Sequence, residues 1–290
     1  MTMLNYEIWD VFTHRPFSGN PLAIVQDAGG LNKAQMQTIA REFNLSETIF
    51  VMPPRDPSHT VQVRIFFPTA EIPFAGHPTI GCALSLAAGR DADLVLEEQA
   101  GLVPVSIRNG EAEFTAPQLP VLHAPPPDAA LIAQALDLSA ADLGFSTHHP
   151  AVWQGGPAFL FLPLASLDAL ARARPIEPFW SRLMQAAQVD CAYLYTPHGD
   201  GYRARMFSPT AGIPEDPATG SASAILAAQF LAAGDLHEGE ADFHLTQGIE
   251  MGRPSQIGMT ARVSAGQLTE IRIKGRAVPI AQGRIRIPGG

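Results

Sequence analysis

The sequence predicts an α+β protein of two pseudo-symmetric halves, each a curved sheet or β-barrel around a central helix. Its 290 residues amount to about two domains of ~150 residues each. One ten-residue pattern occurs once in each half, as an internal repeat would place it. Each copy runs into a helix that is apolar nearly all round, which is typical of an enclosed helix.

The first elements predicted are a β-hairpin and an amphipathic helix. Residues 7–12 alternate as a strand, and residues 22–25 form a second strand after a proline-flanked turn. Over 32–43, apolar residues recur at i, i+3, i+4 and i+7, so we predict a helix. Asn32 and Gln35 have the spacing of a capping box at its start, and we expect the helix to end at the asparagine that follows it.

A carboxylate follows this helix at the start of the next strand. Residues 48–51 are β-branched and aromatic, so Ser46 and Glu47 lie at a helix-to-strand junction. Side chains at such a junction can reach a cleft. A solvated residue at the start of a strand would show the same local pattern, so the pattern alone leaves the role of Glu47 open.

The internal repeat joins residues 64–73 to residues 205–214. The two segments match at a constant offset, with seven identities in ten positions. Each copy leads to a glycine turn, at Gly76 in the first half and at Gly220 in the second. Because the same order of features occurs twice, we interpret the halves as copies of one unit.

Each glycine turn opens one of the enclosed helices, which we expect to end at Gly89 and Gly234. A helix start exposes unpaired backbone N–H groups and the positive end of the helix dipole, which together bind anions. Two such starts facing each other would form a carboxylate-sized site. Ordinary turns before helices are the alternative for either one alone. His77 and Asp216 lie close to these turns as acid/base candidates, and a structural or capping role is the alternative for each.

The domain boundaries are predicted from a cluster of prolines in the middle of the chain. We expect an N-terminal barrel domain at 1–118, a linker at 119–127 and a C-terminal barrel domain at 128–277. The last residues alternate as a strand again, so we expect 278–290 to return to the first domain.

Composition excludes several classes of partner. Charged residues make up 16% of the chain, against roughly 25% in soluble domains, and the net charge is −9. With no stripe of lysine and arginine, we expect neither nucleic acid nor a membrane surface as a partner. A small carboxylate held by backbone N–H groups remains compatible with this charge.

Cysteine and histidine spacing gives no sign of a metal or a disulfide framework. Cys82 and Cys191 form no C-x-x-C, and the pair His148–His149, which we place in a loop, has no ligand spacing. Phosphate-cradle and dinucleotide motifs are absent too. Reduced thiols and an N-terminus without a signal-peptide pattern favour a cytoplasmic protein.

Five segments together resemble one known family, the PhzF-like phenazine-biosynthesis isomerases. They follow the family order and span nearly the whole chain. The segments are Ser18–Pro21, Asn44–Thr48, Pro73–Thr79, Glu215–Ala222 and Met251–Ser255. The resemblance implies the diaminopimelate epimerase-like fold, an active site in the cleft between the domains, no cofactor and a homodimer.

The resemblance also implies roles for single residues. Glu47 would remove and return a proton, and His77 and Asp216 would handle protons or orient the substrate. The substrate would be held by Ser46, Gly76, Gly220 and Ser221. In the phenazine member the substrate resembles trans-2,3-dihydro-3-hydroxyanthranilate, so we expect a cofactor-independent isomerase acting on a small carboxylate-bearing molecule, cyclic or unsaturated and like an amino acid.

Two other functions stay open at this stage. Epimerases of the same fold use two cysteines just before the helix-opening glycines, where this chain has Ala75 and Thr219. A racemase or epimerase using Glu47 and Asp216 in place of thiols is one alternative, and a catalytically silent binding protein is the other. Contact of the substrate with Arg253 or with the loop 144–156 also stays open.

Overall fold

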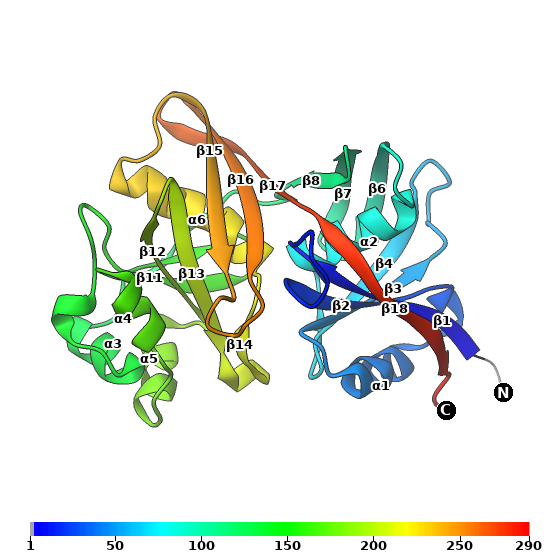
Figure 1. Cartoon of the computed structure of the whole chain (residues 1–290), viewed down its shortest axis with the longest axis horizontal. Helices are drawn as coiled ribbons and strands as arrows, with labels where there is room; N and C mark the ends of the chain where they lie inside the picture. The colour runs from blue at the N-terminus through cyan, green and yellow to red at the C-terminus, as the bar shows by residue number, and fades with distance from the viewer. Residues whose placement is uncertain (1–2, 290) are drawn as a thin grey trace. The chain divides into compact units, whose positions relative to one another are not determined.

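The structure, a computed structural model, describes residues 3–289 and divides into two compact units (Figure 1). One unit comprises the chain up to Pro117 and again from Ile273, and the other comprises Gln118–Arg272. The stretch 119–127, predicted as a linker, contains strand β9 (Val121–Ala124), which pairs with β10 of the second unit. Prolines at 120 and 125 bound this strand, and the apolar residues between them suit β structure.

The first unit is built on one curved sheet (Figure 1). Its strands pair in the order β18-β1-β2-β3-β4-β6-β7-β8, and the short β5 pairs with the end of β4. The β2–β3 and β4–β6 pairs are parallel and the others are antiparallel. The bounds are β1 (Met3–Val11), β2 (Asn20–Val25), β3 (Glu47–Met52), β4 (Val61–Phe66), β5 (Glu71–Ile72), β6 (Ala92–Glu98), β7 (Gly101–Arg108), β8 (Glu111–Thr115) and β18 (Ala277–Arg286).

The first helix of this unit has the predicted ends. A 3₁₀ turn, η1 (Ala28–Gly30), precedes α1 (Lys33–Phe43). The Asn32 side chain accepts from the Gln35 N–H and the Gln35 side chain accepts from the Asn32 N–H, so the capping box is confirmed. Asn44 ends the helix in the left-handed conformation.

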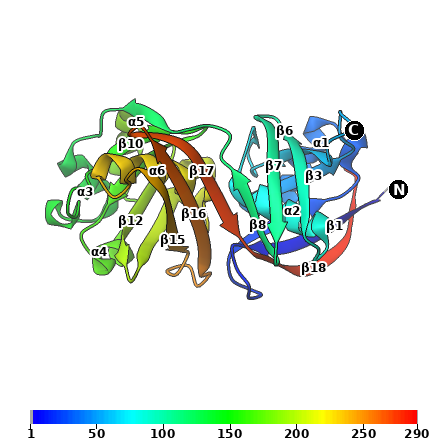
Figure 2. The ribbon, with the colours of Figure 1, turned by 90° about the horizontal axis from the view of Figure 1, so that it is seen from above.

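The central helix of the first unit, α2 (Gly76–Ala87), is enclosed by the sheet. It packs against β1, β2, β3, β6, β7, β8 and β18 (Figure 2). Gly81 permits the close approach, because a Cβ there would lie 2.6 Å from the Leu22 side chain. The helix ends earlier than predicted: Ala88 already has a left-handed φ of 50°, and Gly89 follows with 79°.

The second unit repeats this sheet. Its strands pair in the order β9-β10-β11-β12-β13-β15-β16, with β14 on β13. The parallel pairs are β11–β12 and β13–β15. The bounds are β10 (Ala151–Gln154), β11 (Ala158–Pro163), β12 (Ala192–His198), β13 (Gly201–Ser208), β14 (Ile213–Asp216), β15 (Gly239–Gln247), β16 (Ser255–Ser264) and β17 (Gln267–Gly275).

The helices of the second unit fall into two groups. The central helix α6 (Gly220–Ala233) packs against β10, β11 and β16 and ends at Gly234, as predicted. The others share a core with β10 to β13 around the fully buried Trp180. They are α3 (Ala129–Leu136), α4 (Leu167–Arg172) and α5 (Phe179–Ala187), with the 3₁₀ turns η2 (Ala140–Asp142) and η3 (Pro209–Ala211).

Pairing order confirms the prediction of an α+β fold with two pseudo-symmetric halves. In each unit a parallel pair is followed by an antiparallel one, a short strand and a second parallel pair. The connection inside the second parallel pair contains the central helix each time. The ten-residue repeat lies at the same place in both units, at the end of β4 and of β13.

Candidate active site

A carboxylate and an imidazole meet in the first unit. Glu47 is the first residue of β3 and is 8% exposed, and His77 is the second residue of α2 and is 2% exposed. The parallel pairing of β3 with β2 fixes the register of Glu47, which lies opposite Leu22. Glu47 Oε2 lies 2.9 Å from His77 Nδ1. The helix-to-strand junction thus brings its carboxylate to the start of the enclosed helix.

The two side chains are close but not aligned for a hydrogen bond. Among the described residues, Glu47 Oε2 and both ring nitrogens of His77 have no hydrogen-bond partner. Buried polar atoms without a partner are rare because each costs about 1–3 kcal/mol. Three such atoms on two adjacent side chains are therefore characteristic of a site where a ligand supplies the missing bonds.

The start of α2 is not capped by a side chain. Its N-cap residue is Ala75, whose side chain cannot accept from the N–H groups of Gly76 and His77, and no other described residue caps the helix. Pro78 has no N–H, and the Thr79 N–H already bonds to the Ala75 carbonyl at 3.3 Å. Two backbone donors and the positive end of the helix dipole are therefore available to an anion next to Glu47.

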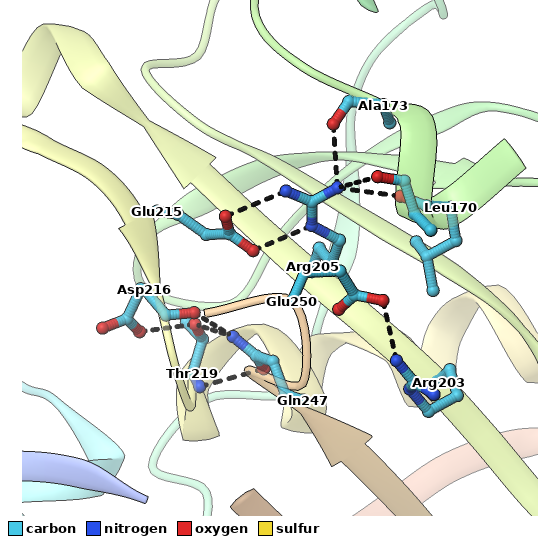
Figure 3. Close-up of polar contacts among 10 residues, drawn as sticks. Leu170, Ala173, Arg203, Arg205, Glu215, Asp216, Thr219, Gln247 and Glu250 are labelled. Carbon is cyan, nitrogen blue, oxygen red and sulfur yellow. Dashed lines mark hydrogen bonds and ion pairs between the residues drawn. The ribbon is translucent and has the colours of Figure 1, made fainter. Parts of the chain in front are cut away.

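In the second unit, hydrogen bonds from Thr219 and Gln247 hold Asp216 at the start of α6 (Figure 3). Thr219 Oγ1 donates to Asp216 Oδ2 at 2.6 Å. Gln247 Nε2 donates to the Asp216 carbonyl at 2.7 Å and to Thr219 Oγ1 at 3.0 Å, and Gln247 Oε1 accepts from the Thr219 N–H at 3.1 Å. Because Gln247 is fully buried, these bonds fix the strand end and the N-cap residue together.

Gly220 and Ser221 are the first two residues of α6, matching Gly76 and His77 in α2. The N-cap Thr219 gives no side-chain cap, because its hydroxyl is turned to Asp216. Both central helices therefore begin without a side-chain cap among residues 3–289. Of the remaining predicted site residues, Ser46 is half-buried just before β3.

The arginines of the repeat support the site rather than enter it. Arg205 makes a bidentate ion pair with Glu215, the residue before Asp216, at 2.8 and 2.9 Å (Figure 3). Its other nitrogen donates to the carbonyls at the end of α4. Arg64, its counterpart in the first unit, makes the same kind of pair with Glu71. The repeated arginine thus fixes the short strand that leads to each central helix.

The turn between β15 and β16 is tied to the same region. Glu250 accepts from Arg203 of β13 at 2.7 Å, and both side chains are mostly buried (Figure 3). Gly248 has a φ of 75°, and a Cβ there would lie 2.4 Å from the Arg253 carbonyl. Only glycine fits this turn, which carries Gln247 at its beginning. Arg253 itself is half-buried.

His148 belongs to a separate polar cluster of the second unit. Its ring nitrogens lie 2.7 Å from Tyr195 Oη and 2.9 Å from Asp235 Oδ2, and burial lowers the pKa of the ring despite Asp235. His149 points outward. The pair lies in a loop, as predicted, and the buried member has a structural role.

The cysteines are not placed for chemistry. Burial raises the pKa of both thiols, Cys82 inside α2 and Cys191 before β12, so neither is ionised near neutral pH. Within residues 3–289, no three side chains of His, Cys, Asp or Glu gather as metal ligands. No helix of that part of the chain is long and apolar enough to cross a membrane.

Sequence reasoning missed three residues that hold the helix starts: Gln247, Thr79 and Glu98. Thr79 Oγ1 lies 2.8 Å from the Ala75 carbonyl and 2.7 Å from Glu98 Oε1. Nothing in the local sequence marks Gln247 or Glu98, since each acts on a residue brought to it by the fold. Thr79, a polar residue in a largely apolar helix, was the one available signal.

This chain is similar to known proteins along nearly its whole length. The family model described as phenazine biosynthesis-like protein, PhzC-PhzF, matches residues 9–283. An uncharacterized isomerase of Mesorhizobium japonicum is 40% identical, covering 99% of this chain and 100% of that protein. The trans-2,3-dihydro-3-hydroxyanthranilate isomerase of Pseudomonas fluorescens is 38% identical over 98% of this chain and 99% of its own. A PhzF-family crystal structure from Bacillus anthracis shares the fold with a TM-score of 0.88 at 24% identity, covering 99% and 100% of the two chains.

Proposed function

Because the chain belongs to the PhzC-PhzF family and is an isomerase, we propose that it moves a proton within a small carboxylate-bearing substrate, with Glu47 as the acid/base. The observation that carries the proposal is the buried Glu47–His77 pair. Three of its polar atoms, Glu47 Oε2 and both ring nitrogens of His77, have no hydrogen-bond partner among the described residues, and the pair adjoins an uncapped helix start. A proton acceptor and an anion-binding element thus occur together in one unit.

Glu47 is suited to both halves of a proton shift. Its carboxylate takes a proton from a substrate carbon, the electrons of that C–H bond move into the conjugated system, and a double bond migrates. The resulting carboxylic acid then returns the proton to a different carbon. No atom is gained or lost, so the reaction is an isomerisation, and one carboxyl group serves as base and then as acid.

His77 is proposed to orient Glu47 and the substrate. Its Nδ1 lies near the carboxylate and its Nε2 has no partner among the described residues, so the ring can bridge between Glu47 and a polar group of the substrate. The N–H groups of Gly76 and His77 would bind the substrate carboxylate. In this arrangement the helix start binds the carboxylate of the substrate, and Glu47 accepts a proton from a carbon of the same molecule.

In the second unit we propose that Asp216 orients a polar group of the substrate and that Gly220 and Ser221 bind through their N–H groups. The hydrogen bond from Thr219 fixes the Asp216 carboxylate in one orientation, in which it can accept a hydrogen bond from the substrate. We assign proton transfer to Glu47.

The test follows C–H bonds directly. The protein is incubated in D₂O with trans-2,3-dihydro-3-hydroxyanthranilate, the substrate that names the Pseudomonas fluorescens relative, and the reaction is followed by NMR. We expect migration of a double bond with wild type and none with Glu47→Gln. The control is Glu42→Gln, the same change at an exposed glutamate five residues earlier, which should react as wild type does.

The outcomes separate the alternatives. Deuterium entering at a stereocentre with inversion would identify an epimerase. Carboxylates that bind with no change in any C–H signal would identify a silent binding protein. Migration that persists in Glu47→Gln would remove Glu47 from the mechanism.

A further inference from the structure

A second buried carboxyl group lies at the start of α2, and the proposed reaction does not use it. Glu98 is the last residue of β6 and is 8% exposed. Its Oε1 contacts Thr79 Oγ1 at 2.7 Å, whereas Oε2 is buried with no hydrogen-bond partner. Within residues 3–289, no lysine, arginine or histidine forms an ion pair with it. An ionised carboxylate in this position would be an uncompensated buried charge.

The hydrogen atoms at Thr79 can be counted. The Thr79 hydroxyl carries one proton, yet its oxygen lies within hydrogen-bond distance of two acceptors, the Ala75 carbonyl and Glu98 Oε1. A carbonyl cannot donate. Both contacts become hydrogen bonds only if Glu98 carries a proton and donates it to Thr79, while Thr79 donates to Ala75. The unpartnered Oε2 is then the carbonyl oxygen of a neutral acid, which costs far less to bury than a charge.

The surroundings of Glu98 also favour its neutral, protonated form. Burial raises the pKa of Glu98 to about 8, although the hydrogen bond from Thr79 opposes the rise. The titratable group that faces it from α2 is Cys82, whose thiol stays neutral under the influence of burial, Glu98 and Glu7 of β1. The adjacent Glu97 has the opposite environment: N–H groups of Asp56 and Arg55 and the ring of His59 lower its pKa to about 2.

We propose that Glu98 is a neutral carboxylic acid at pH 7 and acts as a positioning residue for the proposed site. The chain of hydrogen bonds from Glu98 through Thr79 to Ala75 holds the N-cap residue of α2. It does so without using the N–H groups of Gly76 and His77, which stay available to an anion. Ionisation of Glu98 breaks this chain and places a negative charge beside the anion-binding helix start. Binding of an anionic substrate therefore weakens at alkaline pH.

The protonation state is tested without any assay of activity. Protein labelled with ¹³C at the glutamate carboxyl carbons is titrated from pH 5 to pH 9.5 by NMR, and Glu98 is assigned as the resonance missing in Glu98→Gln. We expect it to show the shift of a neutral acid at pH 7 and to titrate near pH 8. A Glu98 resonance of an ionised carboxylate at pH 6.5 would overturn the proposal, whether or not a substrate is ever found.

The positioning role, which rests on the proposed function, is tested by the pH dependence of KM and kcat for trans-2,3-dihydro-3-hydroxyanthranilate. For wild type we expect KM to rise roughly tenfold between pH 7 and pH 9, with a smaller change in kcat. Glu98→Gln keeps a donor to Thr79 but has no charge to gain, so its KM should stay constant. Glu97→Gln is the matched control and should keep the wild-type rise.

Two outcomes distinguish a failure of the positioning role of Glu98 from a failure of the proposed substrate. If Glu98→Gln and wild type show the same rise in KM, Glu98 does not position the site. If neither protein turns over the compound, the proposed substrate is wrong, while the NMR titration still decides the protonation state. Thr79→Val gives a second variant: it removes the acceptor of the Glu98 proton and should raise KM already at pH 7.

Discussion

His77 Nδ1 lies 2.9 Å from Glu47 Oε2, although thirty positions of sequence, including strands β4 and β5, separate the two residues. The β2–β3 register fixes one of them and the start of the enclosed helix fixes the other. Neither depends on a flexible loop. The pair is therefore held by a strand and a helix of the first unit, as a group that must meet a carbon atom accurately should be.

The first prediction concerns His77. His77→Gln keeps a polar side chain but removes the ring beside Glu47, so we expect kcat to fall roughly 10- to 100-fold while KM changes less than threefold. Steady-state kinetics on the proposed substrate measure this. The control is His14→Gln at an exposed histidine of the same unit. A larger effect on KM than on kcat would make His77 a binding residue instead.

The second prediction concerns Gln247. Gln247→Leu removes the side-chain donor to the Asp216 carbonyl and the side-chain acceptor of the Thr219 N–H, and a buried group that loses its hydrogen bond costs about 1–3 kcal/mol. We expect a lower midpoint of thermal unfolding and a KM raised about tenfold, because the start of α6 loses the hydrogen bonds that fix it. Gln256→Leu, at an exposed glutamine of the next strand, should change neither quantity. An unaltered KM in a destabilised Gln247→Leu protein would confine Gln247 to a structural role.

The third prediction concerns the pH dependence of stability. The pKa of Glu98 in the folded protein, about 8, lies above the ordinary value of 4.5 for glutamate. Its contribution to the free energy of unfolding is therefore complete below pH 4.5 and is lost as the pH rises to 8. Relative to Glu98→Gln, wild type should lose roughly 2–4 kcal/mol between pH 5 and pH 8, one pKa unit being about 1.4 kcal/mol. Urea titrations of both proteins at the two pH values measure it, and parallel curves would contradict the raised pKa.

The fourth prediction concerns Arg205. Arg205→Met leaves the mostly buried Glu215 without its ion-pair partner and removes the donors to the end of α4, so we expect a loss of about 3 kcal/mol in the free energy of unfolding. Arg262→Met is the control, because its ion pair with Glu240 is half exposed and exposed pairs contribute about 0–1 kcal/mol. Similar losses for the two variants would show that burial of the Arg205 pair does not govern its contribution.

The sequence was sufficient to predict what depends on local patterns. The capping box of α1 depends on two residues three apart, and the enclosed helices depend on composition, so both were predictable before any contact was known. The end of α2 was placed one residue late, because Ala88 adopts a left-handed conformation that is common only for glycine and asparagine. The repeat predicted the doubled topology, since the same connections recur in both units.

The residues that hold the helix starts could not be predicted from local sequence patterns. Gln247 reaches Asp216 across 31 positions and Glu98 reaches Thr79 across 19, and the residues are brought together by the pairing of strands and by the packing of α2 against β6. Glu97 and Glu98 are identical neighbours, yet one accepts backbone N–H groups of a loop and the other is enclosed. Alternation along β6 puts them on opposite faces, and which face is interior depends on the rest of the sheet.

The pairing of β18 with β1 bears on the order in which the chain folds during synthesis. The second unit is continuous in sequence, so all of it has been translated before the first unit is complete. The first unit is incomplete until its last strand, β18, has been synthesised, and this strand also packs against α2. The half that holds Glu47 and His77 is thus finished only at the end of translation, and a chain stopped before residue 277 would contain both residues without the strand that closes around them.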